Sequence, residues 1–250
     1  MDLRGKTVLV TGGAKRVGRG ITVAFAEAGA NVVINYNSSV DGARSTLEEV
    51  TALGVEGMTF QADVSDDDQV VAMIDAAAER FGTVDVLVNN ASVFLSDPVP
   101  TDDLTVWRRC IDILVHGSFN CANRVAPLML EHGRGVIIGI GDLSAFEPWP
   151  AFTAHAVGKA AILTLTRQLA LELAPTVRAN AVVFGPALRP VDYSDEKYER
   201  TAQSTLLGRW GTPEEMAHAV RFMAEADYIT GEVITVDAGQ RYGHRQRDHG

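Results

Sequence analysis

The sequence has few cysteines, and the two that it has do not suggest a disulfide or a metal centre. Cys110 and Cys121 stand 11 residues apart in a helical pattern. That spacing places both thiols on one side of a helix, about 16 Å apart along its axis, which is too far for a disulfide. No Cys/His cluster has the spacing of a zinc site. We therefore interpret both cysteines as packing residues and expect no metal.

Long apolar runs and an excess of positive charge are also missing. No run approaches the ~20 apolar residues of a membrane-spanning helix. Residues 1–6 lack the apolar core of a signal peptide. The net charge of −10, from 22 basic and 32 acidic residues, argues against a nucleic-acid or anionic-membrane surface. We expect a cytoplasmic protein with neither kind of partner.

What the sequence does have is an alternation of short apolar runs with helical patterns, at a hydrophobic fraction of 46% over 250 residues. Strands are expected at residues 7–10, 31–35, 56–61, 84–88, 135–140, 178–183 and 233–236. Helices are expected at 18–28, 41–53, 66–81, 104–131, 152–173 and 213–224. This order predicts an α/β fold: one doubly wound, Rossmann-type domain over 1–242, with a seven-stranded, mostly parallel sheet and helices on both faces. A polar tail over 243–250 would follow.

A glycine-rich turn at residues 11–20 follows the first expected strand. Gly12 and Gly18 permit a tight turn and close approach of a ligand to the backbone. The helix that follows would offer free N–H groups and the positive end of its dipole to a pyrophosphate. The spacing differs from the common G-x-G-x-x-G fingerprint. The turn predicts a dinucleotide site, and a turn without ligand is the alternative.

The end of the second expected strand indicates which dinucleotide is bound. Residues 35–39 read Asn-Tyr-Asn-Ser-Ser, and the first acid is Asp41, so no carboxylate is placed to bind the adenosine 2′-hydroxyl. Neutral groups of Asn37 and Ser38, with Arg16 across the loop, would suit a 2′-phosphate. This favours NADP(H) over NAD(H), unless Arg16 only interacts with solvent at the helix start.

Further motifs follow in order along the chain. They are Asp63-Val64, Asn89-Asn90-Ala91-Ser92, His155 four residues before Lys159, and the segments 208–215 and 229–239. Together they resemble the short-chain dehydrogenase/reductase family over residues 5–240. The segments 13–16 and 35–38 and the position of Asp142 are most similar to the pteridine-reductase-like branch of that family.

The resemblance implies a dinucleotide lying across the ends of the parallel strands. The positions that it implies for the cofactor are Gly12, Arg16, Val17 and Gly18 in the phosphate loop, Asp63 and Val64 in the adenine pocket, Asn89 and Ala91 beside the adenosine ribose, Lys159 at the nicotinamide ribose, and Gly185 in the late turn. For the segment 89–91, a purely structural strand-end turn stays open. The family also implies a homo-oligomer, most often a tetramer, in which the helices over 104–131 and 152–173 pair across a two-fold axis.

The family's catalytic set is altered in this sequence. His155 stands at the position of the family's tyrosine, Asp142 stands 13 residues earlier in place of a serine, and Leu114 falls at the position of an asparagine. Only Lys159 of the usual four is intact. Imidazole can donate or accept a proton near neutral pH, and a nearby carboxylate can orient it. We expect Asp142 and His155 to form an acid/base pair, with His155 as proton donor and Lys159 holding the ribose.

Aromatic residues surround the expected site in sequence and indicate a small apolar or aromatic substrate, unless they belong to an interface. They are Phe94, Phe146, Trp149 and Phe152. Tyr193 lies where the family has its substrate loop, and either a place in the site or a surface position is open to it. The leading hypothesis is an NADP(H)-dependent oxidoreductase that reduces a carbonyl or an imine. The alternatives are a lyase, isomerase or cyclase that uses the Asp142/His155 pair without a redox step, and a non-catalytic dinucleotide-binding subunit in which His155 carries no chemistry.

Overall fold

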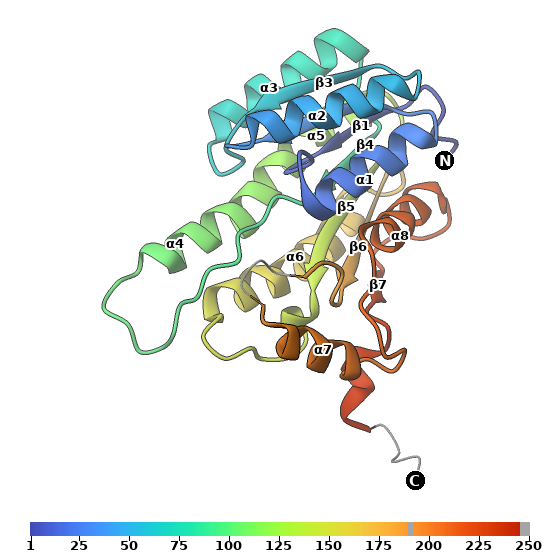
Figure 1. Cartoon of the computed structure of the whole chain (residues 1–250). Coiled ribbons are helices and arrows are strands. Elements are labelled where there is room, and N and C mark those ends of the chain that lie inside the picture. Colours follow the sequence, from blue (N-terminus) through green and yellow to red (C-terminus); the bar gives the residue numbers. More distant parts are fainter. Residues whose placement is uncertain (190–192, 246–250) are drawn as a thin grey trace.

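A parallel sheet of seven strands forms the middle layer of the protein (Figure 1). The computed structural model describes residues 1–189 and 193–245. The strands are β1 (Thr7–Val10), β2 (Asn31–Tyr36), β3 (Gly57–Gln61), β4 (Val86–Asn89), β5 (Gly135–Asp142), β6 (Val177–Phe184) and β7 (Val233–Val236). Their order is β3-β2-β1-β4-β5-β6-β7, and each adjacent pair is parallel. The predicted fold class is confirmed.

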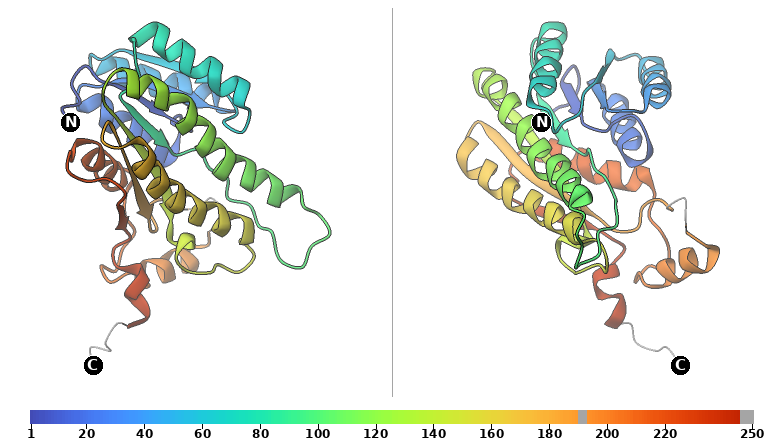
Figure 2. Two further views of the ribbon diagram at one scale, coloured as in Figure 1. Left: turned by 180° about the vertical axis from the view of Figure 1, so that it is seen from behind. Right: turned by 90° about the vertical axis from the view of Figure 1, so that its left-hand side faces the viewer.

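Helices cover both faces of this sheet (Figure 2). The helices of the described residues are α1 (Arg16–Glu27), α2 (Val40–Ala52), α3 (Asp67–Phe81), α4 (Thr105–Ile111), α5 (Ser118–Glu131), α6 (Thr153–Leu173), α7 (Asp195–Gln203) and α8 (Pro213–Glu225), with short 3₁₀ turns at Leu143–Ala145 and Gln240–Arg245. Residues of α1, α2 and α8 pack on one face, and residues of α3, α5 and α6 pack on the other.

Consecutive apolar residues in the central strands pack alternately into the cores on the two faces of the sheet. In β1, Val8 and Val10 belong to the first core and Leu9 to the second. In β2, Val33 likewise faces away from its two neighbours. Side chains alternate between the faces of a strand, so a strand buried on both faces needs apolar residues at every position. This explains the unbroken apolar runs in the sequence.

The helix expected over 104–131 contains a π-helical segment, Asp112–Gly117, between α4 and α5. This segment changes the angular spacing of the side chains, because a π turn contains more residues than an α turn. Cys110 therefore packs with Leu114 and Ala154, whereas Cys121 belongs to the core on the α3/α5 face. Both are buried free thiols, as expected, but the prediction that they share one side of a regular helix is wrong.

Two features near the C-terminus differ from the expected pattern. Helix α7 was not predicted, because it has nine residues of which only Ala202 is buried, and it shows no apolar stripe. The 3₁₀ helix Gln240–Arg245 crosses the expected boundary at residue 242, and residues 246–250 of the expected tail lie outside the described residues. The division into a domain over 1–242 and a tail stays a prediction. Within residues 1–189 and 193–245, no helix has the length and apolar character needed to cross a membrane.

The topology places the loops that matter at one edge of the sheet. The chain moves outward from β1 to β3 and then returns to the other side of β1 as β4. The loops after β1 and β4 therefore diverge to opposite sides at the carboxyl ends of neighbouring strands, where open α/β sheets bind their ligands. Gly12 and Ala91 lie in these two loops and contact each other closely.

Candidate active site

Two cavities lie at this edge of the sheet, one on each side of the loop that follows β1. The first, of about 300 Å³, is lined by residues that follow β1, β2, β3 and β4. The second, of about 560 Å³, is lined mainly by residues that follow β5 and β6 and by α7. Gly12 and Lys15 line the first cavity, and Arg16 and Val17 line the second.

The loop after β1 has the geometry of an anion cradle. Gly12 has a φ of +61°, and a Cβ at Gly18 would lie 2.2 Å from the carbonyl oxygen of Gly12. Any larger residue at Gly18 would therefore displace the loop. Helix α1 begins at Arg16 with no side-chain cap and no acidic residue in its first turn. Its free N–H groups and dipole fit a pyrophosphate, as expected for a dinucleotide site.

Two asparagines hold this loop in place. The Gly12 N–H donates to Oδ1 of Asn35 at 3.1 Å, and the amide of Asn35 donates to the carbonyl of Ala62. The amide of Asn90 donates to the carbonyls of Thr11 and Gly12. Asn35 is buried near the end of β2, where it shapes the loop and also lines the first cavity.

Asn89 does not line either cavity, although the resemblance implied a cofactor position for it. Its buried amide donates to the carbonyl of Ser118 at 3.0 Å and so ties the end of β4 to α5. This is the structural role that the sequence left open for the segment. Ala91 does line the first cavity, together with Val64.

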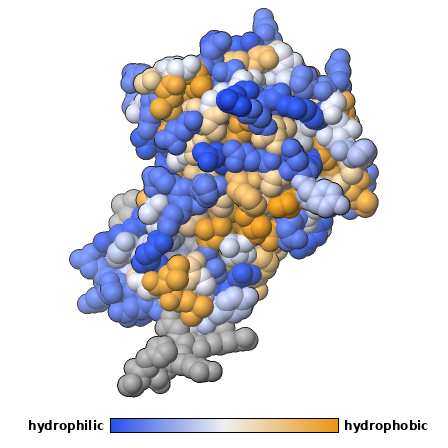
Figure 3. All heavy atoms as spheres, turned by 90° about the vertical axis from the view of Figure 1, so that its right-hand side faces the viewer, coloured by the Kyte–Doolittle hydropathy of each residue, from blue (hydrophilic) through white to orange (hydrophobic). Residues whose placement is uncertain are grey.

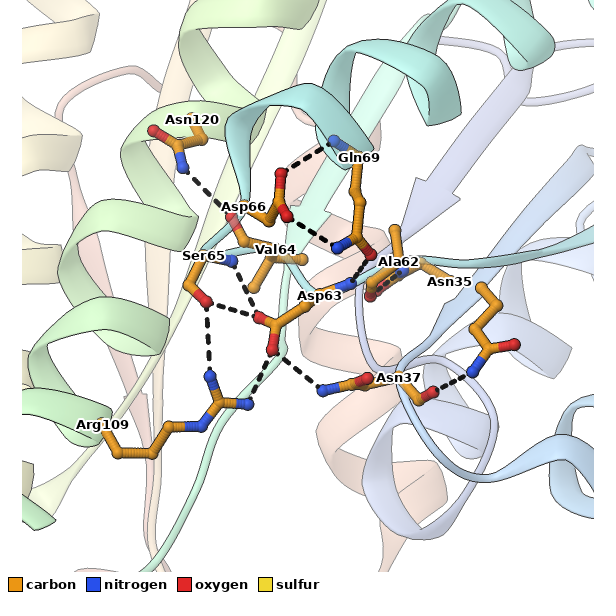
Figure 4. Close-up of polar contacts among 11 residues, drawn as sticks. Asn35, Asn37, Ala62, Asp63, Val64, Ser65, Asp66, Gln69, Arg109 and Asn120 are labelled. Carbon is orange, nitrogen blue, oxygen red and sulfur yellow. Dashed lines mark hydrogen bonds and ion pairs between the residues drawn. The ribbon is translucent and has the colours of Figure 1, made fainter. Parts of the chain in front are cut away.

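A charged network contributes three side chains to the lining of the first cavity, those of Asn37, Asp63 and Arg109 (Figure 4). Oδ2 of Asp63 accepts hydrogen bonds from Nη2 of Arg109 at 2.8 Å and from the amide of Asn37 at 3.1 Å. Its Oδ1 accepts from the backbone and hydroxyl of Ser65. Burial raises the pKa of Asp63, but the hydrogen bonds from Ser65 and Arg109 outweigh it and hold the pKa below its usual value. The network thus joins the ends of β2 and β3 to α4.

The positive charges of the phosphate loop are arranged differently from the prediction. Lys15 lines the first cavity with Asn37 and Ser38, whereas Arg16 lines the second. The reason lies in the backbone, because Arg16 adopts a left-handed conformation with a φ of +55° while Lys15 is extended. Arg16 therefore does not face the groups at the end of β2. Neither Lys15 nor Arg109 was predicted as a site residue.

The catalytic candidates come together at the ends of β5 and α6. His155 is 2% exposed, its Nε2 lies 2.7 Å from Oδ2 of Asp142, and its Nδ1 lies 2.9 Å from the carbonyl oxygen of Val93. A carbonyl oxygen can only accept, so Nδ1 carries a proton. The short contact between Nε2 and Oδ2 of Asp142 requires one proton between these two atoms. The ring of His155 is thus held between Asp142 and the Val93 carbonyl.

The charges around Asp142 favour its ionised form. Burial raises the pKa of Asp142, but the hydrogen bond from His155, the charges of Lys159 and His155, and the hydrogen bond from Ser144 together bring the pKa below its usual value. Lys159 is fully buried, and its Nζ donates to the carbonyl of Ile140 at 3.0 Å. Burial lowers the pKa of Lys159, and the carboxylate of Asp142 opposes this shift. Asp142 therefore lies between two cationic groups.

Of the three candidates, only Asp142 lines the second cavity. His155 lies behind it with both ring nitrogens engaged, so the structure does not present a free ring nitrogen to a substrate. The sequence led us to expect His155 as the proton donor, with Asp142 as its partner. The hydrogen bond to the Val93 carbonyl turns the other ring nitrogen toward Asp142, so His155 reaches the cavity only through Asp142.

Aromatic rings form one wall of the second cavity. Phe94 stacks on Phe152 with 4.3 Å between ring centroids and meets His155 edge-on at 5.0 Å, while Trp149 stacks on His155 at 6.3 Å. Tyr193 and Gly185 also line this cavity. Phe146 does not line it, and the guanidinium of Arg241 lies over its ring.

Leu114, at the position of the family's asparagine, is fully buried in the π-helical segment and packs on Gly158 of α6. A Cβ at Gly158 would lie 2.6 Å from the nearest Leu114 carbon. The close contact fixes the depth at which α6 lies against this segment. Leu114 therefore contributes packing beneath the site and no polar group.

Known proteins resemble this chain over nearly its whole length. A family model described as enoyl-(acyl carrier protein) reductase matches residues 12–241. The chain is 36% identical over 246 residues to 3beta-hydroxysteroid dehydrogenase 1 of Eggerthella lenta, which covers 95% of this chain and 94% of that protein. It is 36% identical over 239 residues to the 3-oxoacyl-[acyl-carrier-protein] reductase FabG of Staphylococcus aureus, covering 94% and 97%. The crystal structure of FolM alternative dihydrofolate reductase 1 from Brucella canis, complexed with NADP, matches with a TM-score of 0.91 and 31% identity, over 100% of this chain and 99% of that one.

Proposed function

The chain belongs to the short-chain dehydrogenase/reductase family, and we propose that it is an NADP(H)-dependent reductase of a carbonyl or imine in a small apolar or aromatic molecule. The observation that carries this proposal is the buried Asp142–His155 pair. Asp142 of this pair lines a cavity that has an aromatic wall. The loop that fits a pyrophosphate lies beside the same cavity. Within the family we place the chain in the pteridine-reductase-like branch, on the segments 13–16 and 35–38 and on Asp142. Its cytoplasmic location stays a prediction.

The residues that would hold NADP(H) lie on both sides of the phosphate loop. Gly12, Val17 and Gly18 shape the pyrophosphate site, and Asp63, Val64 and Ala91 line the adenosine side. We assign Lys15, Asn37 and Ser38, which line the first cavity, to the 2′-phosphate, and Gly185, which lines the second, to the nicotinamide side. The nicotinamide ribose is assigned to Lys159 on the family resemblance, since its Nζ donates to the Ile140 carbonyl here. The nicotinamide, when bound, supplies the hydride. The solved FolM complex with NADP supports this choice of cofactor.

In this proposal, Asp142 and His155 together carry out the acid/base catalysis. The Nδ1 proton of His155 is held by the Val93 carbonyl, so the transferable proton is the one between Nε2 and Oδ2 of Asp142. When that proton leaves, the ring keeps its bond to Val93 through Nδ1. Asp142 faces the cavity, so a substrate atom that develops negative charge takes the proton through Asp142. The hydrogen bond from His155 and the charge of Lys159 hold the pKa of Asp142 below its usual value.

The test of this function is a spectrophotometric screen with NADPH and a panel of aromatic ketones, aldehydes and cyclic imines. The proposal expects NADPH absorbance to fall with at least one of them. Conversion of a substrate at constant NADPH would favour the lyase, isomerase or cyclase alternative. Dinucleotide binding with no conversion of any substrate would favour a non-catalytic subunit.

The protein is expected to bind NADPH at least about tenfold more tightly than NADH, because hydrogen bonds to a charged phosphate contribute about 1.5–3 kcal/mol each. Lys15, Asn37 and Ser38 line the cavity that would receive this phosphate. Titration of each cofactor by nucleotide fluorescence measures the preference. The variant Ser38→Asp places a carboxylate at the strand end and should reverse the preference. Equal or tighter binding of NADH by the wild-type protein would refute this assignment.

A homotetramer is the expected assembly. An apolar groove between α5 and α6, lined by Leu114, Phe119 and Leu165 among others, remains open on one side of the molecule. Hydrophobic residues also gather on the opposite side, where α8 and β7 lie (Figure 3). Two uncovered apolar faces per chain allow a closed tetramer with two kinds of two-fold contact.

Light scattering should therefore give about four times the chain mass of 26.8 kDa. Leu165→Glu, in the groove, is expected to lower that mass. Leu53→Glu, an exposed residue at the end of α2, is the matched control and should leave the mass unchanged. A wild-type mass near that of one chain at micromolar concentration would contradict the assembly.

A further inference from the structure

Two loops outside regular secondary structure carry the aromatic wall of the second cavity. One runs from Ala91 toward Asp97 and holds Phe94, and the other precedes α6 and holds Trp149 and Phe152. Phe94 and Trp149 contact the ring of His155, so the positions of the two loops determine how the catalytic pair is enclosed. What holds the two loops together is a question that the proposed function leaves open, and the inference below rests on that function.

Asp97 makes the contacts that join them. Its N–H donates to the carbonyl of Ala151 at 2.8 Å, and it forms an isolated parallel bridge with Phe152. Its Oδ2 accepts from the N–H of Ala154 at 2.7 Å. Asp97 thus forms hydrogen bonds with both the second loop and the start of α6.

The contact with Ala154 is a helix cap supplied from a distant segment. Helix α6 begins after Phe152, whose side chain cannot cap it. Asp97, 57 residues away in the chain, provides the acceptor and places a carboxylate at the positive end of the helix. The residue immediately after Ala154 is His155. The cap therefore acts on the first turn of the helix, where the ring of His155 is oriented.

Asp97 itself does not reach the cavity. It is 7% exposed and is not among the lining residues. Its second oxygen, Oδ1, is buried and has no hydrogen-bond partner among the described residues. A buried polar atom without a partner lowers stability and calls for an explanation. A role of Asp97 in holding the two loops together explains the cost of this unpartnered oxygen, because the side chain and the N–H of Asp97 make the contacts at Ala151, Phe152 and Ala154.

The same loop makes a second bond to α6. Val93 lies four residues before Asp97, and its carbonyl accepts a hydrogen bond from Nδ1 of His155. Phe94, between these two attachment points, packs on Phe152 and meets His155 edge-on. Ala151 has a φ of +62°, a conformation that persists in a non-glycine residue only where its surroundings impose it. The bond from the Asp97 N–H to its carbonyl is one of those surroundings.

We propose that Asp97 is a positioning residue for the catalytic pair: it fixes the first turn of α6 and the loop of Val93, so that His155 keeps Nδ1 on Val93 and Nε2 on Asp142. Without the carboxylate, the Val93 loop loses one of its two attachments to α6. The His155 ring then loses a fixed acceptor for its Nδ1 proton. Asp142 would remain in place on β5, but the proton it shares with the ring would no longer be held in one geometry.

The test uses the full chain with ¹⁵N-labelled histidine and follows the ring N–H protons of His155, assigned by their absence in His155→Phe. Asp97→Ala removes the acceptor, and Asp97→Asn keeps an acceptor oxygen. Thr212→Ala removes the side-chain cap of α8 and is the matched control for a lost helix cap. In wild-type protein, both ring protons should exchange slowly with solvent. In Asp97→Ala, we expect faster exchange of the Nδ1 proton, with near wild-type exchange in Asp97→Asn and Thr212→Ala.

Turnover provides the second readout. Asp97→Ala should lower kcat about 10- to 100-fold, since small displacements of a catalytic group have effects of this size. The Kd for NADPH should stay within twofold, because Asp97 contacts neither the phosphate loop nor the first cavity. Asp97→Asn should recover most of the loss. If Asp97→Ala does not fold, Asp97→Gln takes its place, since it moves the acceptor by one methylene, and the same loss of Nδ1 protection is expected.

Wild-type exchange of the Nδ1 proton in Asp97→Ala, or in the substitute Asp97→Gln, would overturn the proposal. So would a fall in protection as large in Thr212→Ala, because a general loss of stability would then explain the effect. The ring protons can be followed whether or not the protein reduces any substrate. Failure of the proposed reductase function would therefore appear as absent turnover with the predicted exchange pattern intact, and would be distinct from failure of this inference.

Discussion

Replacing Asp142 with asparagine is expected to lower turnover by about 10²–10⁴-fold, the range typical for loss of a positioned acid or base. Asparagine has nearly the same shape, but its amide cannot take up the proton that Nε2 of His155 shares with Oδ2. It also removes the negative charge that lies between His155 and Lys159. The measurement is the steady-state rate with NADPH and the substrate found by screening. The Kd for NADPH should remain close to the wild-type value, because the phosphate loop is untouched.

The surface offers a matched control for this variant. His116 and Asp112 form another histidine–aspartate pair, with 3.2 Å between Nδ1 and Oδ1, and both side chains are exposed. Asp112→Asn breaks a pair of the same chemistry outside the second cavity and should leave turnover unchanged. Turnover of Asp142→Asn within threefold of wild type would show that Asp142 does not pass the proton.

Replacing His155 with phenylalanine is expected to lower turnover by a similar factor, even though the ring does not face the cavity. The variant removes the source of the shared proton and leaves Asp142 without its partner. The free energy of unfolding should also fall by about 1–3 kcal/mol, since a largely buried carboxylate loses a charged hydrogen bond. The rate is measured on the same substrate, and stability by chemical denaturation with NADPH absent.

A double variant sharpens this second prediction. Asp142 and His155 are expected to act as one unit, so the variant with both substitutions should be little slower than either single variant. His132→Phe, at the exposed end of α5, is the control for loss of an imidazole on the surface. If His155→Phe retains turnover within threefold of wild type, the proton comes from elsewhere, and Tyr193 in the second cavity is the next candidate. His155→Tyr should show only weak activity, because Leu114 still supplies no polar group.

Local patterns predicted the sheet well, because each strand depends on residues close together in the chain. The strand ends shifted by only one or two residues, and unbroken apolar runs correctly indicated strands buried on both faces. The π-helical segment was missed, since hydrophobic spacing does not distinguish it from an α turn. Lys15 rather than Arg16 lies in the first cavity with Asn37 and Ser38, because a single left-handed residue redirects the side chains of the loop.

The geometry around His155 could not be predicted in the same way. Its second partner is a main-chain carbonyl, at Val93, and every residue type carries that group. Arg109 and Asp97 were missed for a related reason, because each contacts its partner over dozens of residues and neither belongs to a recognisable motif. The composition of the site was thus available from the sequence, whereas the orientation of its groups depends on the packing of loops.

The most direct test of the account follows a labelled hydride. The protein is incubated with NADPH deuterated at the transferable position of nicotinamide C4 and with the substrate identified by screening, and the product is analysed by mass spectrometry. The account predicts one deuterium on the former carbonyl or imine carbon, and almost none with Asp142→Asn or His155→Phe at equal protein concentration. Product formed without deuterium, or deuterium transfer undiminished in Asp142→Asn, would contradict it.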